Sequence, residues 1–371
     1  MTWASRGRTL AVLIAGLFAA CGEDPIGPPP PILELPRELT VAEQRVIEAS
    51  NRFAFDLLRE VRRRTEAPNL FLSPLSASMA LGMTLNGAAG QTFDQMRATL
   101  GFGPLTQEEI NTSYRDLIQL LLNLDRGVEM RIANSTWARK GFTFEPGFFT
   151  TVRDFFDAET RELDFDLPGA VDTINAWVKA KTRGRIDSIV EEIDPLDIMF
   201  LLNAVYFKGN WTTAFDPART RHAPFHLDTG GTVEVGMMFG EEMPVSLGWV
   251  DRVQLAELPY GGRAFGLVVV LPPEGMRLAD FVTGLDADTW AAWMGALQPV
   301  EEAMVALPKF RLSYDDALKA PLQALGMVDA FDPERADFSK LTAREDAYIS
   351  AVRMAGWTER SGGAVPEVPG P

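Results

Sequence analysis

The stretch "NLFLSPLSASMALGMTLNGAAG", residues 69–90, decides how the chain folds. Ser73 followed by Pro74 is typical of the N-cap and first turn of a helix, and Asn86-Gly87 is typical of a helix end. The residues between them are apolar or small, and the small ones that make the helix thin are Ala77, Ser78, Ala80 and Gly82. A helix with almost no polar face must be buried, so we expect a large domain built around it.

Two further helices are expected on either side of this one. Thr40 and Glu43 form a capping box, and apolar residues follow them at helical spacing, which predicts an amphipathic first helix. Ile174, Trp177 and Lys181 place a third amphipathic helix farther along the chain.

Residues 198–207 are apolar except for Asn203. A continuous apolar run of this length, with Val, Tyr and Phe in it, predicts a strand that is covered on both faces. Asn203 is then a buried amide, and an unpaired buried amide costs about 1–3 kcal/mol. We therefore expect Asn203 to have specific hydrogen-bond partners.

The C-terminal half of the chain reads as strands with few helices. Residues 255–275 predict a hairpin that turns at Gly261-Gly262, residues 304–315 predict a further strand, and residues 317–325 predict a short helix. Strands and helices do not alternate regularly, so the fold class is mixed α and β with largely antiparallel sheets.

Composition excludes several classes of function. The chain has 371 residues and a formal net charge of −16, which argues against nucleic acid and anionic membrane surfaces as partners. It has one cysteine, so no intrachain disulfide can form, and the motifs of common hydrolases, kinases and dinucleotide-binding enzymes are absent from it. His222 and His226 flank Pro224 and are interpreted as surface loop residues, with a metal pair as the weaker alternative. We expect no enzyme activity, no cofactor and no metal site.

The N-terminus reads as an export signal. Residues 1–20 combine Arg6 and Arg8 with an apolar stretch that is too short to span a membrane. Cys21 ends a stretch that resembles a bacterial lipobox, which predicts lipid attachment there; plain secretion is the alternative. Residues 21–39 are a proline-rich linker. The protein is thus expected to be a cell-surface or periplasmic lipoprotein, or to be extracellular.

Five ordered blocks of the chain resemble the serpins. They are residues 69–90, "INAWVKAKTRGRIDSIV" (174–190), "MFLLNAVYFKGNW" (199–211), "LPYGGRAFGLVVVLPPEG" (258–275) and "LPKFRLSYDDALKAPLQALGMVDAFDPERADFS" (307–339). The resemblance runs from residue 40 to about residue 352. It implies one domain with three mostly antiparallel sheets and eight or nine helices.

The resemblance also implies a function. Inhibitory serpins offer a reactive loop to a serine or cysteine protease, and the cut loop inserts into the central sheet while the protease is still attached as an acyl-enzyme. Insertion of this kind is strand addition driven by stored metastability. The target protease supplies the chemistry, and the inhibitor works as a monomer. The alternative is a non-inhibitory serpin-like binding or structural lipoprotein.

Four residues match the moving parts of the family. The resemblance places Ser73, Ser76 and Asn203 in the shutter, the polar cluster beneath the point where the sheet parts, with Asn203 bonded to the helix that carries the serines. It places Trp211 at the breach, where insertion begins. The alternatives are a helix cap for Ser73, a satisfied core amide for Asn203 and an ordinary core residue for Trp211.

The resemblance fails after Arg353. The shutter histidine of the family is expected near Met354, and residues 354–371 match neither the hinge, nor the reactive loop, nor the closing strands. A frameshift in the reading of the gene is one explanation, and a degenerate family member is the other. We expect residues 354–371 to form no ordered element, the last strands of the fold to be missing, and the buried helix to lose the sheet that it lies against. A chain of this sequence is then inactive and prone to aggregate.

Overall fold

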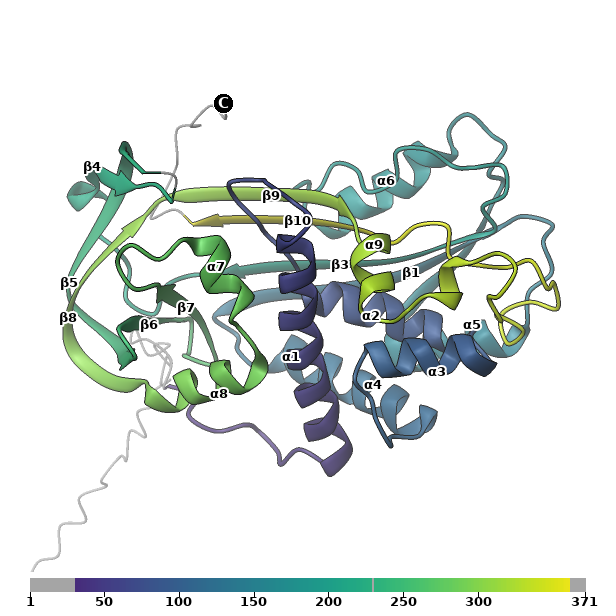
Figure 1. Ribbon diagram of the computed structural model, residues 1–371, viewed down its shortest axis with the longest axis horizontal. Coiled ribbons are helices and arrows are strands. Elements are labelled where there is room, and N and C mark those ends of the chain that lie inside the picture. Colours follow the sequence, from purple (N-terminus) through teal and green to yellow (C-terminus); the bar gives the residue numbers. More distant parts are fainter. Residues whose placement is uncertain (1–30, 229, 361–371) are drawn as a thin grey trace, which may run out of the picture.

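The computed structural model describes residues 31–228 and 230–360 of the chain (Figure 1). Within them, nine α-helices follow the order α1 (Val41–Arg62), α2 (Pro74–Leu85), α3 (Gly90–Thr99), α4 (Gln107–Asn123), α5 (Pro146–Phe156), α6 (Ala170–Lys181), α7 (Leu278–Thr283), α8 (Ala287–Ala296) and α9 (Lys319–Ala324). Two short 3-10 helices are η1 (Pro217–Arg219) and η2 (Asp329–Phe331).

The strands of the described residues form three sheets. The first has the order β2 (Ala158–Leu163), β1 (Val128–Arg139), β3 (Met199–Gly209), and the second pairs β10 (Arg353–Arg360) with β9 (Phe310–Ala317). The third is five-stranded: β4 (Arg221–His226), β5 (Thr232–Val250), β6 (Val253–Tyr260) and β7 (Phe265–Leu271) in order, with β8 (Gln298–Pro308) also paired to β5. Every pair is antiparallel except β1–β2, so the predicted mixed class with mostly antiparallel sheets is confirmed.

Helix α1 begins as the sequence predicts. The Thr40 hydroxyl accepts from the N–H of Glu43, and the Glu43 carboxylate accepts from the N–H of Thr40, which completes the capping box. One face of the helix, including Phe53 and Leu57, is buried in the main core together with residues of α2, α3, α4 and α5. This core surrounds α2.

Helix α2 is buried, as its composition predicts, and it remains buried without the closing strands that the family resemblance places behind it. Met79, Leu81, Met83 and Leu85 are each at most 1% exposed. Burial of such a side chain contributes about 1.5–3 kcal/mol. The prediction that α2 exposes an apolar face is therefore wrong, because α1, α3 and α5 pack against it together with β3.

Strand β3 is covered on both faces, which confirms the prediction from its apolar run. Leu202 and Ala204 lie in the core beneath α6, whereas Met199 and Leu201 pack against the core around α2. This alternation follows from the two-residue period of a strand. In Figure 1, α6 lies above β1 and β3, and α2 lies below them.

Two strand predictions need correction. Residues 304–315 do not form one strand: β8 ends at Pro308 and β9 begins at Phe310, in another sheet. The Lys309 N–H still donates to the carbonyl of Gly236 in β5 at 2.8 Å, and from Phe310 onward the chain pairs with β10 instead. His222 and His226 are not in a loop but in the exposed edge strand β4.

The expectation for residues 354–371 is wrong for its first seven residues. Strand β10 pairs with β9 in an antiparallel register that runs from Arg353 opposite Ala317 to Arg360 opposite Phe310. The free edge of β9 provides backbone partners, and such long-range pairing overrides a weak local pattern. Residues 361–371 lie outside the described residues, as do residues 1–20, Cys21 and the linker as far as residue 30. Among the described residues, no helix combines the length and the apolar character needed to cross a membrane.

Candidate functional site

The candidate site is the seam between β3 and β10. These strands lie next to each other in Figure 1, but each belongs to a different sheet, and no backbone ladder joins them in the described part of the chain. At one end, the hydroxyl of Ser350 donates to Oδ1 of Asp197 at 2.8 Å and links the segment before β10 to the segment before β3. The facing edges of the two strands are therefore not paired with each other.

A pair of buried amides lies beside the seam. Asn203 on β3 and Asn134 on β1 are opposite each other in the ladder, and Nδ2 of Asn203 donates to Oδ1 of Asn134 at 2.8 Å. Nδ2 of Asn134 in turn donates to the carbonyl of Phe156 at 2.6 Å. Asn203 is 8% exposed, and its Oδ1 has no hydrogen-bond partner within the described residues.

Asn203 contacts the helix that carries the two serines, but it does so through a methionine. Nδ2 of Asn203 reaches α2 through the sulfur of Met79, at 3.5 Å. Ser73 is the N-cap of α2 without a side-chain capping bond, and its hydroxyl lies 2.9 Å from that of Ser76. The structure thus brings Asn203 to the helix that carries the serines but gives it Asn134 and Met79 as partners.

Trp211 lies where β3 ends, in an aromatic cluster. Its ring stacks on Tyr260 with centroids 4.6 Å apart and meets Phe215 edge-on at 5.8 Å. Trp211 and Tyr260 also form an isolated β-bridge. A side chain at Gly209 would place its Cβ 2.7 Å from the Tyr260 ring, so glycine is required for this close approach. The β3 sheet and the five-stranded sheet therefore meet at Trp211.

Two of these residues were missed by sequence reasoning. Asn134 lies in β1 with Ser135 and Thr136 directly after it, so it does not stand out from an apolar run as Asn203 does, and the sequence does not show that the two strands pair. Tyr260 precedes the Gly261-Gly262 turn and gives no sign of its contact with Trp211.

Helix α6 is held over the sheet by a group of charges. Glu159 on β2 accepts from the indole N–H of Trp177 at 3.1 Å and from Arg161 at 2.8 Å, and it also pairs with Lys181. Burial disfavours the charged form of Glu159, but hydrogen bonds from Lys181, Arg161 and Trp177 outweigh burial and lower its pKa to about 2. This carboxylate fixes α6 to the edge of the β2-β1-β3 sheet.

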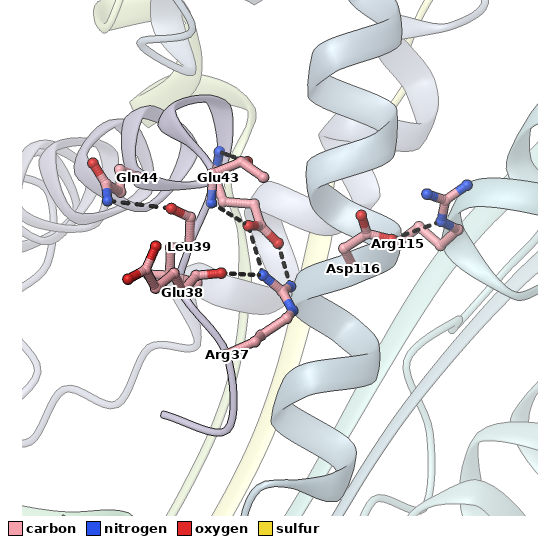
Figure 2. Close-up of polar contacts among 8 residues, drawn as sticks. Arg37, Glu38, Leu39, Glu43, Gln44, Arg115 and Asp116 are labelled. Atoms are coloured by element: carbon pink, nitrogen blue, oxygen red, sulfur yellow. Dashed lines mark hydrogen bonds and ion pairs between the residues drawn. The ribbon is translucent and has the colours of Figure 1, made fainter. Parts of the chain in front are cut away.

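The N-terminal segment, residues 32–39, lies on the surface of the domain and is here named the strap. Its Ile32 N–H donates to the carbonyl of Gly262 at 2.7 Å. Figure 2 shows the guanidinium of Arg37 in a two-pronged contact with Glu43, one arm of which is 2.8 Å long. The hydrogen bonds from Arg37 lower the pKa of Glu43 in spite of its burial. This part of the expected linker is thus bound at two points.

The family profile, the related sequences and the solved structures that this chain matches all belong to one family. The family profile described as "Serpin (serine protease inhibitor)" matches residues 48–355. Human Serpin B9 is 34% identical over 310 residues, which are 81% of each chain, and the bovine leukocyte elastase inhibitor is 32% identical over 323 residues, covering 83% of this chain and 84% of that protein. The solved structure of tengpin, a thermophilic serpin in its native state, is 29% identical and has a TM-score of 0.78 over 90% of this chain and 86% of tengpin.

Proposed function

The chain belongs to the serpin family, and on this premise we propose that its domain inhibits a serine or cysteine protease by adding a strand between β3 and β10. The observation that carries the proposal is the seam without a ladder, flanked by the buried pair of Asn203 and Asn134. A strand added here would pair with two free edges at once, and it would do so beside α2 and not in solvent.

The inhibition needs no catalytic group of this chain. A protease forms the acyl-enzyme with its own nucleophile, and the inhibitor contributes the free energy that is released when the added strand completes the sheet. Trp211 stands at the end of β3, and we propose that insertion begins there. The relatives named as inhibitors, such as the leukocyte elastase inhibitor, support protease inhibition as the class of function.

We further propose that the polypeptide of these 371 residues does not itself trap a protease. Residues 354–371 contain only the short run of small residues 361–364, which follows the bulky and charged stretch 357–360, and residues 353–360 are already paired with β9. Translation of the gene in its other two frames beyond codon 353 tests the frameshift explanation. A Glu- and Gly-containing hinge followed by small residues is expected in one of them.

The test compares two chains. The first is the 371-residue polypeptide, and the second replaces the residues after Arg353 with the hinge, reactive loop and closing strands of an inhibitory relative. Each is mixed with trypsin-like, chymotrypsin-like and subtilisin-like proteases and examined for an SDS-stable adduct. We expect no adduct from the first chain and an adduct with at least one protease from the second.

A matched control makes this result specific for insertion. Replacing one small hinge residue of the second chain with glutamate should convert it from an inhibitor into a substrate, because a charge then has to enter the buried side of the sheet. Adduct formation by the 371-residue chain, or cleavage without any adduct in the second chain, would overturn the proposal. Simple binding of a partner without adduct would favour the non-inhibitory alternative.

We also propose export with lipid attachment at Cys21, on the strength of the sequence pattern. Metabolic labelling with a fatty acid should label the wild-type chain in a bacterial host and leave Cys21→Ser unlabelled. Secretion of an unlabelled wild-type chain would contradict attachment.

A further inference from the structure

The turn between β6 and β7, residues 260–264, is bonded to both neighbours of Trp211. The Gly261 N–H donates to the carbonyl of Asn210 at 2.8 Å, and the Gly261 carbonyl accepts from the hydroxyl of Thr212 at 3.0 Å. The Trp211 ring itself stacks on Tyr260, the first residue of the turn. The backbone and the ring of Trp211 are therefore both positioned by this one turn.

A buried carboxylate holds the turn from inside. Asp125 is 6% exposed and lies in the connection between α4 and β1. Its Oδ2 accepts from the N–H of Gly262 at 2.8 Å, and its Oδ1 accepts from the N–H of Gly127 at 2.8 Å. A Cβ at Gly127 would lie 2.8 Å from Cα of Gly261, so the two loops approach as closely as glycines allow. A buried carboxylate in such a place is stabilised by the N–H groups that it binds.

The strap holds the same turn from outside. The Ile32 N–H donates to the Gly262 carbonyl, so the peptide units of Gly262 are bonded to Asp125 on one side and to Ile32 on the other. Five residues farther on, Arg37 binds Glu43, whose side chain is 2% exposed at the start of α1. Between these two points residues 33–36 are exposed, and Leu33 is 81% exposed. The strap thus ties the turn to α1.

We propose that residues 260–264 are a latch for the breach, locked from inside by Asp125 and closed from outside by the strap. Asp125 is a positioning residue, since it acts on Trp211 only through the turn. The effect of the latch on inhibition rests on the proposed function, in which a strand is inserted starting at Trp211. A force or a binding event on the residues before Ile32 would then change the position of the turn, and through it the position of Trp211.

The test is amide hydrogen exchange on the full chain with two variants and two controls. Ile32→Pro removes the N–H that binds Gly262 from a segment that is already proline-rich, and Leu33→Pro is its control at the neighbouring exposed residue. Asp125→Asn replaces one accepting oxygen of the lock with an amide, and Asp116→Asn is its control on α4. We expect each variant to speed exchange in residues 258–264 and 209–213 by about tenfold, because local opening governs exchange in such segments. The controls should leave both segments unchanged.

Several results would overturn the latch. Faster exchange in the turn without faster exchange around Trp211 would show that the two are not coupled, and unchanged exchange in both variants would show that neither contact matters. If Asp125→Asn unfolds the whole chain, Ile32→Pro alone decides between these outcomes. The exchange data do not depend on protease trapping, so the latch and the proposed function can fail separately.

Discussion

Asn203 and Asn134 are joined side chain to side chain across the β1–β3 ladder, and they form the buried polar link of the sheet next to its seam. The pair is one-sided: Asn203 donates through Nδ2, while its Oδ1 has no partner in the described part of the chain. A buried polar pair with one unpaired atom lowers the stability of the fold, and a donor placed next to that atom should raise it.

The first prediction concerns the loss of this pair. Asn203→Ala leaves Oδ1 of Asn134 buried without its donor, and the free energy of unfolding should fall by about 1–3 kcal/mol in urea denaturation. Asn69→Ala, at an exposed loop position, is the control and should change little. Equal effects of the two substitutions would show that the pair contributes nothing.

The second prediction concerns the unpaired Oδ1. The family resemblance implies a histidine near Met354 and places Asn203 in the same shutter, so a ring N–H is the donor that we expect for Oδ1 of Asn203. Met354→His should raise the free energy of unfolding by about 0.5–1.5 kcal/mol, the usual net value of one hydrogen bond. In the Asn203→Ala background the same substitution should give no gain, and a gain that persists there would refute the link to Asn203.

The third prediction tests the contact between the sheets at Trp211. Gly209→Ala places a methyl group 2.7 Å from the Tyr260 ring, which has to leave its stack with Trp211. Such overpacking costs about 1–3 kcal/mol, measurable as a lower urea midpoint. Gly236→Ala is the control in strand β5, because the nearest atom to its Cβ is Cδ of Lys309, 3.9 Å away. A Gly209→Ala chain as stable as this control would mean that the stack is easily displaced.

The fourth prediction concerns pH. The folded state lowers the pKa of Glu159 from its usual 4.5 to about 2, so its contribution to stability is fully present above pH 4.5 and is lost as the pH falls towards 2. Glu159→Gln should therefore flatten the decline of stability across this interval, whereas Glu162→Gln, at an exposed position of the same strand, should not. Glu159 is about one-third exposed, so the effect should shrink in high salt. Parallel curves for wild type and Glu159→Gln would show that the charge does not hold α6.

The sequence predicts well those features that local patterns determine. The capping box of α1, the buried character of α2 and the two covered faces of β3 follow from spacing and composition, and each is confirmed. What it cannot predict is pairing between distant segments. The partner of Asn203 depends on the β1–β3 register, which joins residues 69 positions apart, and β10 forms because β9 offers an edge. The burial of α2 has the same origin, since β3 and helices from other parts of the chain pack against it.

The seam has a mechanical consequence. Among the described strands, β10 shares a ladder only with β9, so a pull applied at Arg360 and directed away from the sheet meets the ladder bonds one after another and not all together. Strands loaded in this way unzip at low force, whereas strands loaded along their length shear at high force. A force applied beyond Arg360 would therefore detach β10 first and leave the β2-β1-β3 sheet intact.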